Sequence, residues 1–178
     1  IKSPKQAVEN GICYLSEDRK QYGLLLIKSV AENSAISSMD NYIKAGWISE
    51  KKLHKAAEIT NKKLRTKTPS MDQLVKNLSG GNQQKVIVAR WLLKDSDIFI
   101  FDEPTRGIDI GAKSEMYELM EDLANKGKSI IMISSELSEI QRLSDRVVVM
   151  CEGRVAKELD IKDATQETIM KYATMREE

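Results

Sequence analysis

The sequence predicts an α/β fold, with a parallel β-sheet flanked by helices and a small, mostly helical subdomain. Two apolar runs, residues 98–101 and 130–133, have the length and composition of strands that are buried in a parallel sheet. Helical patterns lie next to both runs, and this alternation of strand and helix is typical of a doubly wound sheet with right-handed crossovers. Between residues 29 and 78 short helical patterns dominate instead, which indicates the subdomain.

The order of the expected elements follows from apolar spacing and turn residues. A short β-prone run at 11–15 ends in a charged cluster at 16–20, which must reach solvent or a ligand. A helix over 50–64 is expected from an apolar stripe made of Leu53, Ala56, Ala57 and Leu64. After it we expect, in order, helix 82–93, strand 98–101, helix 112–126 with a stop at Gly127, strand 130–133, helix 136–143, a third strand at 147–150 that turns at 151–153 into 154–156, and a helical tail after Asp160.

We expect one partial domain over 1–178, divided into the helical subdomain (29–78), an α/β core (79–160) and a C-terminal helical tail (161–178). The first residue is Ile1 rather than methionine, so we expect that the chain begins inside a longer protein.

Composition excludes several classes of protein. The 178 residues are 41% hydrophobic and 31% charged, which is a globular balance, and the formal net charge of +1 gives no global reason to bind nucleic acid. No apolar run approaches the roughly 20 residues of a membrane-spanning helix, and no signal peptide is visible, so we expect a soluble intracellular domain. Cys13 and Cys151 lie in apolar runs, and we expect both to be buried small hydrophobes.

The first candidate site is Ser79-Gly80-Gly81, which precedes a predicted helix. Serine is a good N-cap, and glycine lets the backbone approach a ligand closely. The free N–H groups and the dipole of the helix would then face an anion. The alternative is a flexible loop before an ordinary helix.

The second candidate site is Asp102-Glu103, at the end of the apolar run 98–101. Placing two adjacent carboxylates at the end of a buried strand costs free energy unless cations lie next to them. Neighbouring side chains of a strand point to opposite faces, so the two acids can serve separate roles. One would hold Mg²⁺ through water, and the other would orient or deprotonate an attacking water. The alternative is a pair of solvated acids in a loop.

Together the two motifs resemble the nucleotide-binding domain of ABC ATPases. The stretch 78–85 reads LSGGNQQK, and about twenty residues later a hydrophobic strand ends in DEPT. The resemblance implies a P-loop NTPase-like fold that uses ATP and Mg²⁺. It implies the following roles: the signature motif for Ser79, Gly80 and Gly81 with Gln83 beside them, the magnesium ligand through water for Asp102, the catalytic carboxylate for Glu103, the D-loop for Arg106 to Asp109, and the position of the Q-loop glutamine for Glu17.

The particular residues in and around these motifs resemble a narrower group, the second ATPase half of tandem sugar importers of the ribose/galactose/xylose type. The stretches that carry this are GNQQK, DEPTRGID followed by GAK, and ISSEL. The resemblance implies three partners: an N-terminal ATPase half of the same chain, a transmembrane permease that contacts residues 29–78, and, indirectly, an extracytoplasmic sugar-binding protein. It also implies a peripheral location on the cytoplasmic face of the membrane.

Two departures from the family pattern bear on activity. The P-loop sequence G-x-x-x-x-G-K-[ST] is absent from the chain. In the family it precedes the Q-loop, so the resemblance implies that the N-terminal part of the domain is missing, and we expect the isolated chain to be inactive. Ser135 occupies the position of the family's switch histidine, and it is assigned to the nucleotide site on that basis. The only histidine, His54, lies on a lysine-rich helix and is expected at the surface. Two alternatives stay open: a degenerate, mainly structural half that supplies its signature to a partner's site, and an ABC ATPase that does not act in transport.

Overall fold

The computed structural model describes residues 1–175. These residues belong to two compact units, Ile1–Ile133 and Ser134–Glu178, which are described separately below. The boundary between the units falls inside the expected core of 79–160. No helix among the described residues is both long enough and apolar enough to cross a bilayer.

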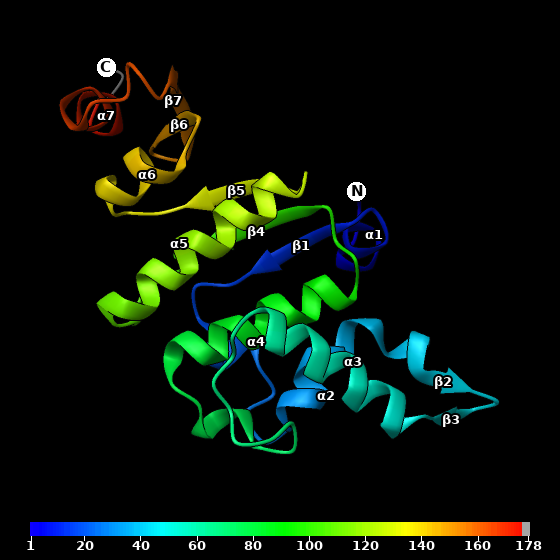
Figure 1. Cartoon of the computed structure of the whole chain (residues 1–178). Coiled ribbons are helices and arrows are strands. Elements are labelled where there is room, and N and C mark those ends of the chain that lie inside the picture. Colours follow the sequence, from blue (N-terminus) through cyan, green and yellow to red (C-terminus); the bar gives the residue numbers. More distant parts are fainter. Residues whose placement is uncertain (176–178) are drawn as a thin grey trace. The chain divides into compact units, whose positions relative to one another are not determined.

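The first unit contains a three-stranded parallel sheet (Figure 1). Its strands are β1 (Ile12–Leu15), β4 (Ile98–Asp102) and β5 (Ser129–Ile133), in the order β1-β4-β5. The predictions of a short strand after Gly11 and of two apolar parallel strands are therefore confirmed. The register places Leu15 beside Phe101, so the carboxyl ends of the strands lie at one edge of the sheet.

One face of this sheet is covered by two long helices. Helix α4 (Gly80–Leu93) contacts β1, and α5 (Ile110–Asn125) contacts β5. The strand side chains on this face are buried, and they include Cys13, Leu15, Phe99 and Phe101. Gly127 follows α5 with φ +82°, as expected for the stop of that helix.

The opposite face of the sheet is open. Tyr14, Ile131 and Ile133 on this face are each about half exposed, whereas a parallel sheet normally has helices on both faces. The apolar strands, expected to be buried in a parallel sheet, are therefore buried on one face only within the first unit, because its two long helices lie on that face.

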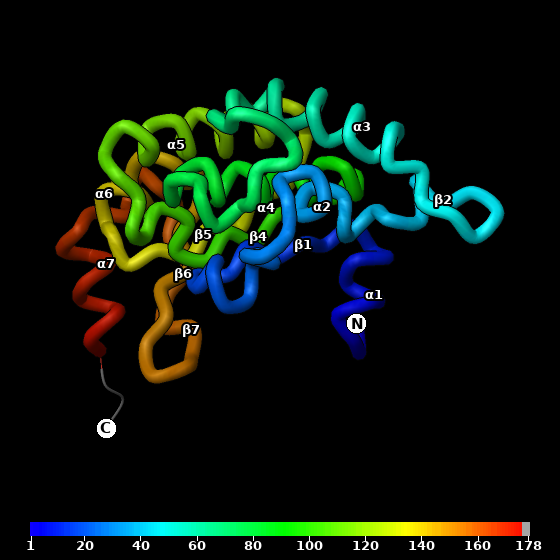
Figure 2. Tube along the Cα trace, turned by 90° about the horizontal axis from the view of Figure 1, so that it is seen from below, coloured from blue at the N-terminus to red at the C-terminus, as the bar shows by residue number. Residues whose placement is uncertain are grey.

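Residues 29–78 contain α2 (Val30–Ala35), the 3₁₀ segment η2 (Ile36–Tyr42), α3 (Glu50–Lys63) and a short 3₁₀ turn, η3 (Val75–Asn77). They share a small core formed by Ala31, Ala35, Tyr42, Leu53 and Ala57. A two-stranded hairpin of β2 (Ile43–Lys44) and β3 (Trp47–Ile48), which the sequence did not predict, extends from it (Figures 1 and 2).

Helix α2 is tied to the segment before it and to α4 by polar contacts. Ser29 and Glu32 form a capping box at its start. The buried side chain of Asn33 accepts a hydrogen bond from the backbone N–H of Leu25 and donates one to its carbonyl oxygen, both at 2.9 Å. Arg90 of α4 donates from Nε to the Asn33 carbonyl oxygen at 2.9 Å. The helical region is therefore anchored to α4, the helix that begins at Gly80.

Two short elements complete the first unit. Helix α1 (Pro4–Glu9), which the sequence did not predict, is capped by Ser3. The π-helical turn η1 (Arg19–Gly23) follows β1. His54 is partly exposed on α3, with Nε2 3.6 Å from Asp72 Oδ1, which agrees with the expected surface position.

The second unit packs a hairpin against two helices. Its elements are α6 (Leu137–Leu143), β6 (Arg146–Cys151), β7 (Arg154–Asp160) and α7 (Gln166–Ala173). Glu152 and Gly153, with φ of +48° and +79°, form the predicted turn. The core contains Val147, Val149, Leu159, Ala164 and Ile169.

The strand predicted at 147–150 does not join the parallel sheet. Strand β6 pairs with β7 in a sheet of its own, so the prediction of a third strand in the doubly wound sheet is wrong for the described residues. The predicted helical tail agrees with α7, although its last residues, 176–178, lie outside the described part. Cys151 is only half-buried, so the burial predicted for both cysteines holds for Cys13 alone.

Candidate functional site

The glycine pair forms the first turn of α4. The helix begins at Gly80, two residues earlier than predicted, with Ser79 at the N-cap position. The Ser79 side chain makes no hydrogen bond to the backbone of the turn, and its Oγ accepts one from Asn82 Nδ2 at 2.8 Å. Because no side chain caps this turn, its N–H groups remain oriented as an anion-binding helix start. Gln83 is buried and donates from Nε2 to the Val75 carbonyl oxygen at 3.2 Å.

The acidic pair lies at the carboxyl end of β4. Asp102 is the last residue of the strand, and its Oδ2 accepts a hydrogen bond from Tyr14 Oη at 2.5 Å across from β1. The backbone turns sharply at Glu103, where φ is +45°, and the Glu103 N–H donates to the Ile133 carbonyl oxygen at 2.9 Å. This positive φ takes Glu103 out of the strand conformation and away from the direction of Asp102.

The hydroxyl of Tyr14 keeps its proton over a wide pH range. Its hydrogen bond to the Asp102 carboxylate, followed by burial, raises the pKa of the Tyr14 phenol above its usual value. Tyr14 therefore remains a donor to Asp102, and it occupies only one oxygen of that carboxylate. This contact could not be predicted from the sequence, because the two residues belong to different strands.

The loop after β4 leads into α5. Asp109 is the N-cap of that helix, and its Oδ1 accepts from the backbone N–H of Ala112 at 3.0 Å. Gly107 has φ of +66°, a left-handed conformation that glycine adopts without strain. Thr105 is buried at the start of the same loop. Asp109, expected to contact nucleotide, is thus also a structural cap.

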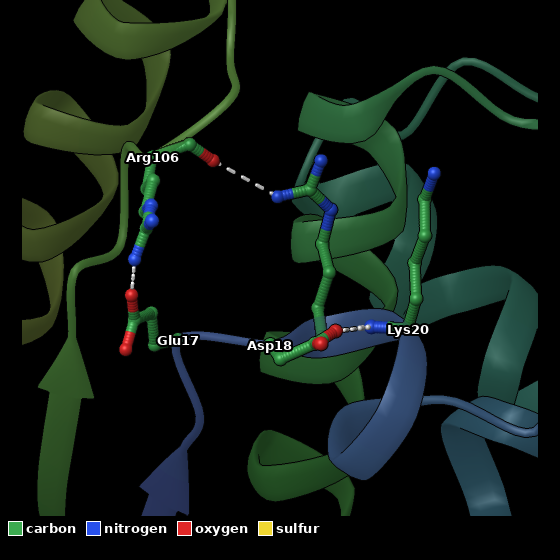
Figure 3. Close-up of a pocket in the computed structure, with 5 residues that line it drawn as sticks. Glu17, Asp18, Lys20 and Arg106 are labelled. Carbon is green, nitrogen blue, oxygen red and sulfur yellow. Dashed lines mark hydrogen bonds and ion pairs between the residues drawn. The ribbon is translucent and has the colours of Figure 1, made fainter.

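Glu17 forms an ion pair with Arg106 of this loop (Figure 3). The two residues line a pocket of about 460 Å³ together with Asp18, Arg19 and Lys20. The charged cluster after β1 is thus largely exposed, as expected, and it meets the loop after β4. The Glu17–Arg106 ion pair therefore joins the segment after β1 to the loop that follows the acidic pair at the end of β4.

The sequence pattern of the ABC transporter family matches residues 3–106, which is more than half of the chain. The chain belongs to the ABC transporter family. Its curated relatives include a putative ribose/galactose/methyl galactoside import ATP-binding protein of Halalkalibacterium halodurans, 55% identical over 98% of this chain and 33% of that protein. Another is the ribose import ATP-binding protein RbsA of Clostridium tetani, 52% identical over 97% of this chain and 34% of that protein. The chain therefore spans about a third of the length of these relatives.

Solved ABC cassettes share the fold. A nucleotide-free ATP-binding cassette from an ABC transporter has a TM-score of 0.78 at 21% identity, covering 98% of this chain and 73% of that one. The dimeric cassette MJ0796 bound to ADP and Pi has a TM-score of 0.72 at 20% identity, covering 90% of this chain and 68% of that one. These similarities confirm the α/β, P-loop NTPase-like fold predicted from the sequence.

The residues at the end of β4 fit the Mg²⁺ ion that the sequence resemblance implies, as the carboxylate of Asp102 shows. No cluster of three or more potential ligands occurs among residues 1–175, so the chain offers no all-protein metal cage there. Magnesium sites at nucleotides commonly use one or two carboxylates together with phosphates and water. Asp102 can supply one such carboxylate, because Tyr14 binds only its Oδ2.

Ser135 belongs to the second unit, between β5 and α6. Its neighbour Ser134 donates from Oγ to Glu139 Oε2 at 2.8 Å and accepts from the Glu136 N–H at 3.0 Å, and these bonds organise the turn into α6. The position of Ser135 in the ABC switch therefore stays a prediction.

Proposed function

We propose that this chain acts as the second ATPase half of a tandem ABC importer, where it binds and hydrolyses ATP to drive uptake of a monosaccharide. The import ATP-binding relatives, 52–55% identical over nearly the whole chain, support this proposal. The partners would be an N-terminal ATPase half, a membrane permease and, indirectly, a sugar-binding protein. Such a chain would lie on the cytoplasmic face of the membrane, in agreement with its lack of a described membrane-spanning helix.

The observation that carries the proposal is the uncapped start of α4, in the same unit as the carboxylates at the end of β4. The turn of Ser79, Gly80 and Gly81, with Gln83, would close over the phosphates of a nucleotide held by the other half. Asp102 would hold Mg²⁺ through water, and Glu103 would orient or deprotonate the attacking water. Asp109, Glu17 and Ser135 would complete the surroundings of the nucleotide.

Residues 29–78 and the loop at Glu17–Lys20 are the proposed permease contact. The support for this is the exposure of that loop and its contact, through Arg106, with the segment after the acidic pair. Cross-linking in the assembled transporter should link the permease to these residues. Cross-links that instead map to the tail after Asp160 would contradict the assignment.

The isolated chain is proposed to bind Mg·ATP weakly, because it contains no G-x-x-x-x-G-K-[ST] sequence to surround the phosphates. Titration calorimetry of this chain should give no measurable heat at micromolar ATP. Micromolar affinity would contradict this part of the proposal.

A second candidate, a half that mainly serves its partner's site, is favoured by two residues. The Glu17 carboxylate, at the position of a glutamine, is paired with Arg106. Ser135 cannot replace an imidazole near a phosphate, because its hydroxyl stays neutral near pH 7. Both candidates are compatible if this half drives transport but hydrolyses ATP slowly.

Two substitutions in a protein of the relatives' length decide between the candidates. Ser79→Arg should abolish most ATPase activity in steady-state assays, because it places a bulky side chain at the start of α4 and blocks the partner's site. If this half is the slower one, Glu103→Gln should cost less. Loss of turnover in Glu103→Gln, together with nearly full activity in Ser79→Arg, would reverse the assignment of roles.

A further inference from the structure

Arg19 connects three segments of the first unit that are distant in sequence. It is the first residue of η1, and its side chain is half-buried. Nη1 donates a hydrogen bond to the Arg106 carbonyl oxygen at 3.0 Å, and Nη2 donates to that of Gly107 at 3.4 Å. Nε donates to Gln83 Oε1, also at 3.4 Å. One guanidinium therefore links the segment after β1, the start of α4 and the loop after β4.

The Arg19 guanidinium lies next to α4 at Gly80. A β-carbon at Gly80 would lie 2.6 Å from Arg19 Nη2 and 3.2 Å from the Gly107 carbonyl oxygen. At Gly81, in contrast, a β-carbon would lie 2.7 Å from the β-carbon of Ala112 on α5. The two adjacent glycines therefore make room for different neighbours: Gly80 for the guanidinium, and Gly81 for α5.

Charge attraction does not account for this position of Arg19. The start of a helix carries partial positive charge, so a cation beside it is unfavourable. The planar guanidinium, however, presents several N–H donors in a fixed fork, and three oxygen acceptors surround it. A lysine ammonium could not reach the same acceptors as a rigid group. Hydrogen-bond geometry thus specifies arginine here.

A second contact joins the segment after β1 to the loop after β4, and here the arginine side chain comes from the loop. The Arg106 side chain of the loop after β4 pairs with Glu17 (Figure 3), while Arg19 donates a hydrogen bond to the backbone of that loop. Asp18 fixes the start of η1 by accepting from the N–H groups of Lys20 and Gln21 at 3.1 and 3.0 Å. Arg19 therefore extends from a turn that is itself held in place.

We propose that Arg19 is a positioning residue that holds the signature turn against the D-loop, and that Gly80 lacks a side chain in order to admit it. The inference rests on the proposed function, in which these two segments surround a nucleotide. Arg19 acts through Gln83 and through the backbone of Arg106 and Gly107. Without Arg19 the two segments lose these hydrogen bonds and can shift relative to each other, and displacements of about 1 Å at a reacting site cost on the order of a hundredfold in rate.

The kinetic test uses a protein of the relatives' length that contains this chain. Arg19→Ala and Arg19→Lys should each lower kcat for ATP hydrolysis about tenfold to a hundredfold. KM for ATP should change by less than about threefold, because Arg19 organises the closed site rather than the initial binding of nucleotide. An unchanged kcat in both variants would overturn the positioning role.

The contact between Arg19 and Gly80 is tested by thermal unfolding of the same protein. Gly80→Ala should lower the unfolding midpoint more when Arg19 is present than in the Arg19→Ala background, where only the 3.2 Å contact with the Gly107 carbonyl oxygen remains to offset the better helix propensity of alanine. Gly81→Ala is the matched control, because its clash with Ala112 should cost the same in both backgrounds. If Arg19→Ala does not fold, Arg19→Lys provides the same cycle, since lysine lacks Nη2.

An equal cost of Gly80→Ala in both backgrounds would overturn the reason given for Gly80. Failure of the proposed function is a different outcome, because it would appear as a wild-type protein without ATPase activity. The unfolding measurements do not depend on that activity, and they would still decide whether Arg19 and Gly80 are coupled.

Discussion

The two faces of the parallel sheet differ sharply, and adjacent residues of β1 demonstrate it. Cys13 lies on the face covered by α4 and α5 and is 1% exposed, whereas Tyr14 lies on the open face and is 50% exposed. The register places Phe99 in the row of Cys13, and Ile131 in the row of Tyr14. The same strands thus carry a packed core on one face and a partly solvated surface on the other.

This difference separates the stability of the site from its chemistry. Phe99 and Phe101 are fully buried, with ring centroids 6.1 Å apart, and they anchor β4 from the covered face. Asp102 continues the opposite row, where it meets Tyr14. We infer that the covered face fixes where β4 ends, while the open face carries the polar contact that orients the carboxylate.

The largest expected effect is in thiol reactivity, where Cys13 on the covered face is compared with Cys151 on β6 of the second unit. Burial raises the pKa of the Cys13 thiol to about 12. At pH 8 about one Cys13 thiol in ten thousand would be ionised, roughly a thousandfold less than for an ordinary thiol. Iodoacetamide should therefore modify the half-buried Cys151 long before Cys13, as mass spectrometry of digests would measure. Comparable rates under native conditions would mean that the covered face opens readily.

The next contrast is in stability. Phe101→Ala removes a fully buried ring from the covered face and should lower the free energy of unfolding by about 3–5 kcal/mol. Ile131→Ala removes a half-exposed side chain from the open face and should cost less than about 1 kcal/mol. Urea denaturation of the two variants measures both values. Similar costs would indicate that the open face is covered in solution.

Local sequence patterns predicted the helices and strands whose own residues indicate their type and their ends. The apolar runs in β4 and β5 and the stop of α5 at Gly127 needed no knowledge of distant residues. For β6 the turn into β7 was predictable from local residues, but the absence of pairing with the parallel sheet was not, because the choice of a partner strand depends on non-local contacts. The β2–β3 hairpin has two residues per strand, too few for a periodic pattern.

The candidate site was predictable only as a set of residues. The sequence indicated the glycine pair and the carboxylates at the end of β4 by their neighbours along the chain. It gave no signal for Tyr14 on Asp102 or for Arg19 beside Gly80, because those contacts join residues more than sixty positions apart. Arg19 also stood within a run of charged residues, which usually indicates a solvated surface.

The Lys85–Glu115 ion pair joins α4 to α5 on the covered side of the sheet. It should make a moderate, pH-dependent contribution to the free energy of unfolding. Lys85 Nζ lies 2.7 Å from Glu115 Oε2; the Lys85 side chain is 5% exposed and that of Glu115 is 44% exposed. The hydrogen bond from Lys85 lowers the pKa of Glu115 in the folded protein. The stabilisation is therefore complete above the unfolded-state pKa of about 4.3 and is lost as the pH falls through the lower, folded-state value.

Glu115→Gln should cost about 1 kcal/mol at pH 7, since half-exposed ion pairs are screened by solvent. Between pH 7 and pH 3 the variant should lose less stability than the wild type does, as urea midpoints across this range would measure. Glu118→Gln, an exposed position on the same helix, is the control and should keep the wild-type pH dependence. Parallel pH profiles for Glu115→Gln and the wild type would exclude the pair as a source of stability.

The smallest effect on stability is expected on the open face, at Tyr14. Tyr14→Phe removes one hydrogen bond at a half-exposed position and should change the free energy of unfolding by about 0.5 kcal/mol or less. Its functional effect should be larger, because groups that orient a metal's ligands typically change metal affinity by about tenfold or more. In an ATPase-competent protein of the relatives' length, Tyr14→Phe should therefore raise the Mg²⁺ concentration for half-maximal hydrolysis, with Tyr22→Phe as the exposed control. A loss of stability above about 1 kcal/mol with an unchanged Mg²⁺ requirement would instead assign Tyr14 to the packing of the sheet.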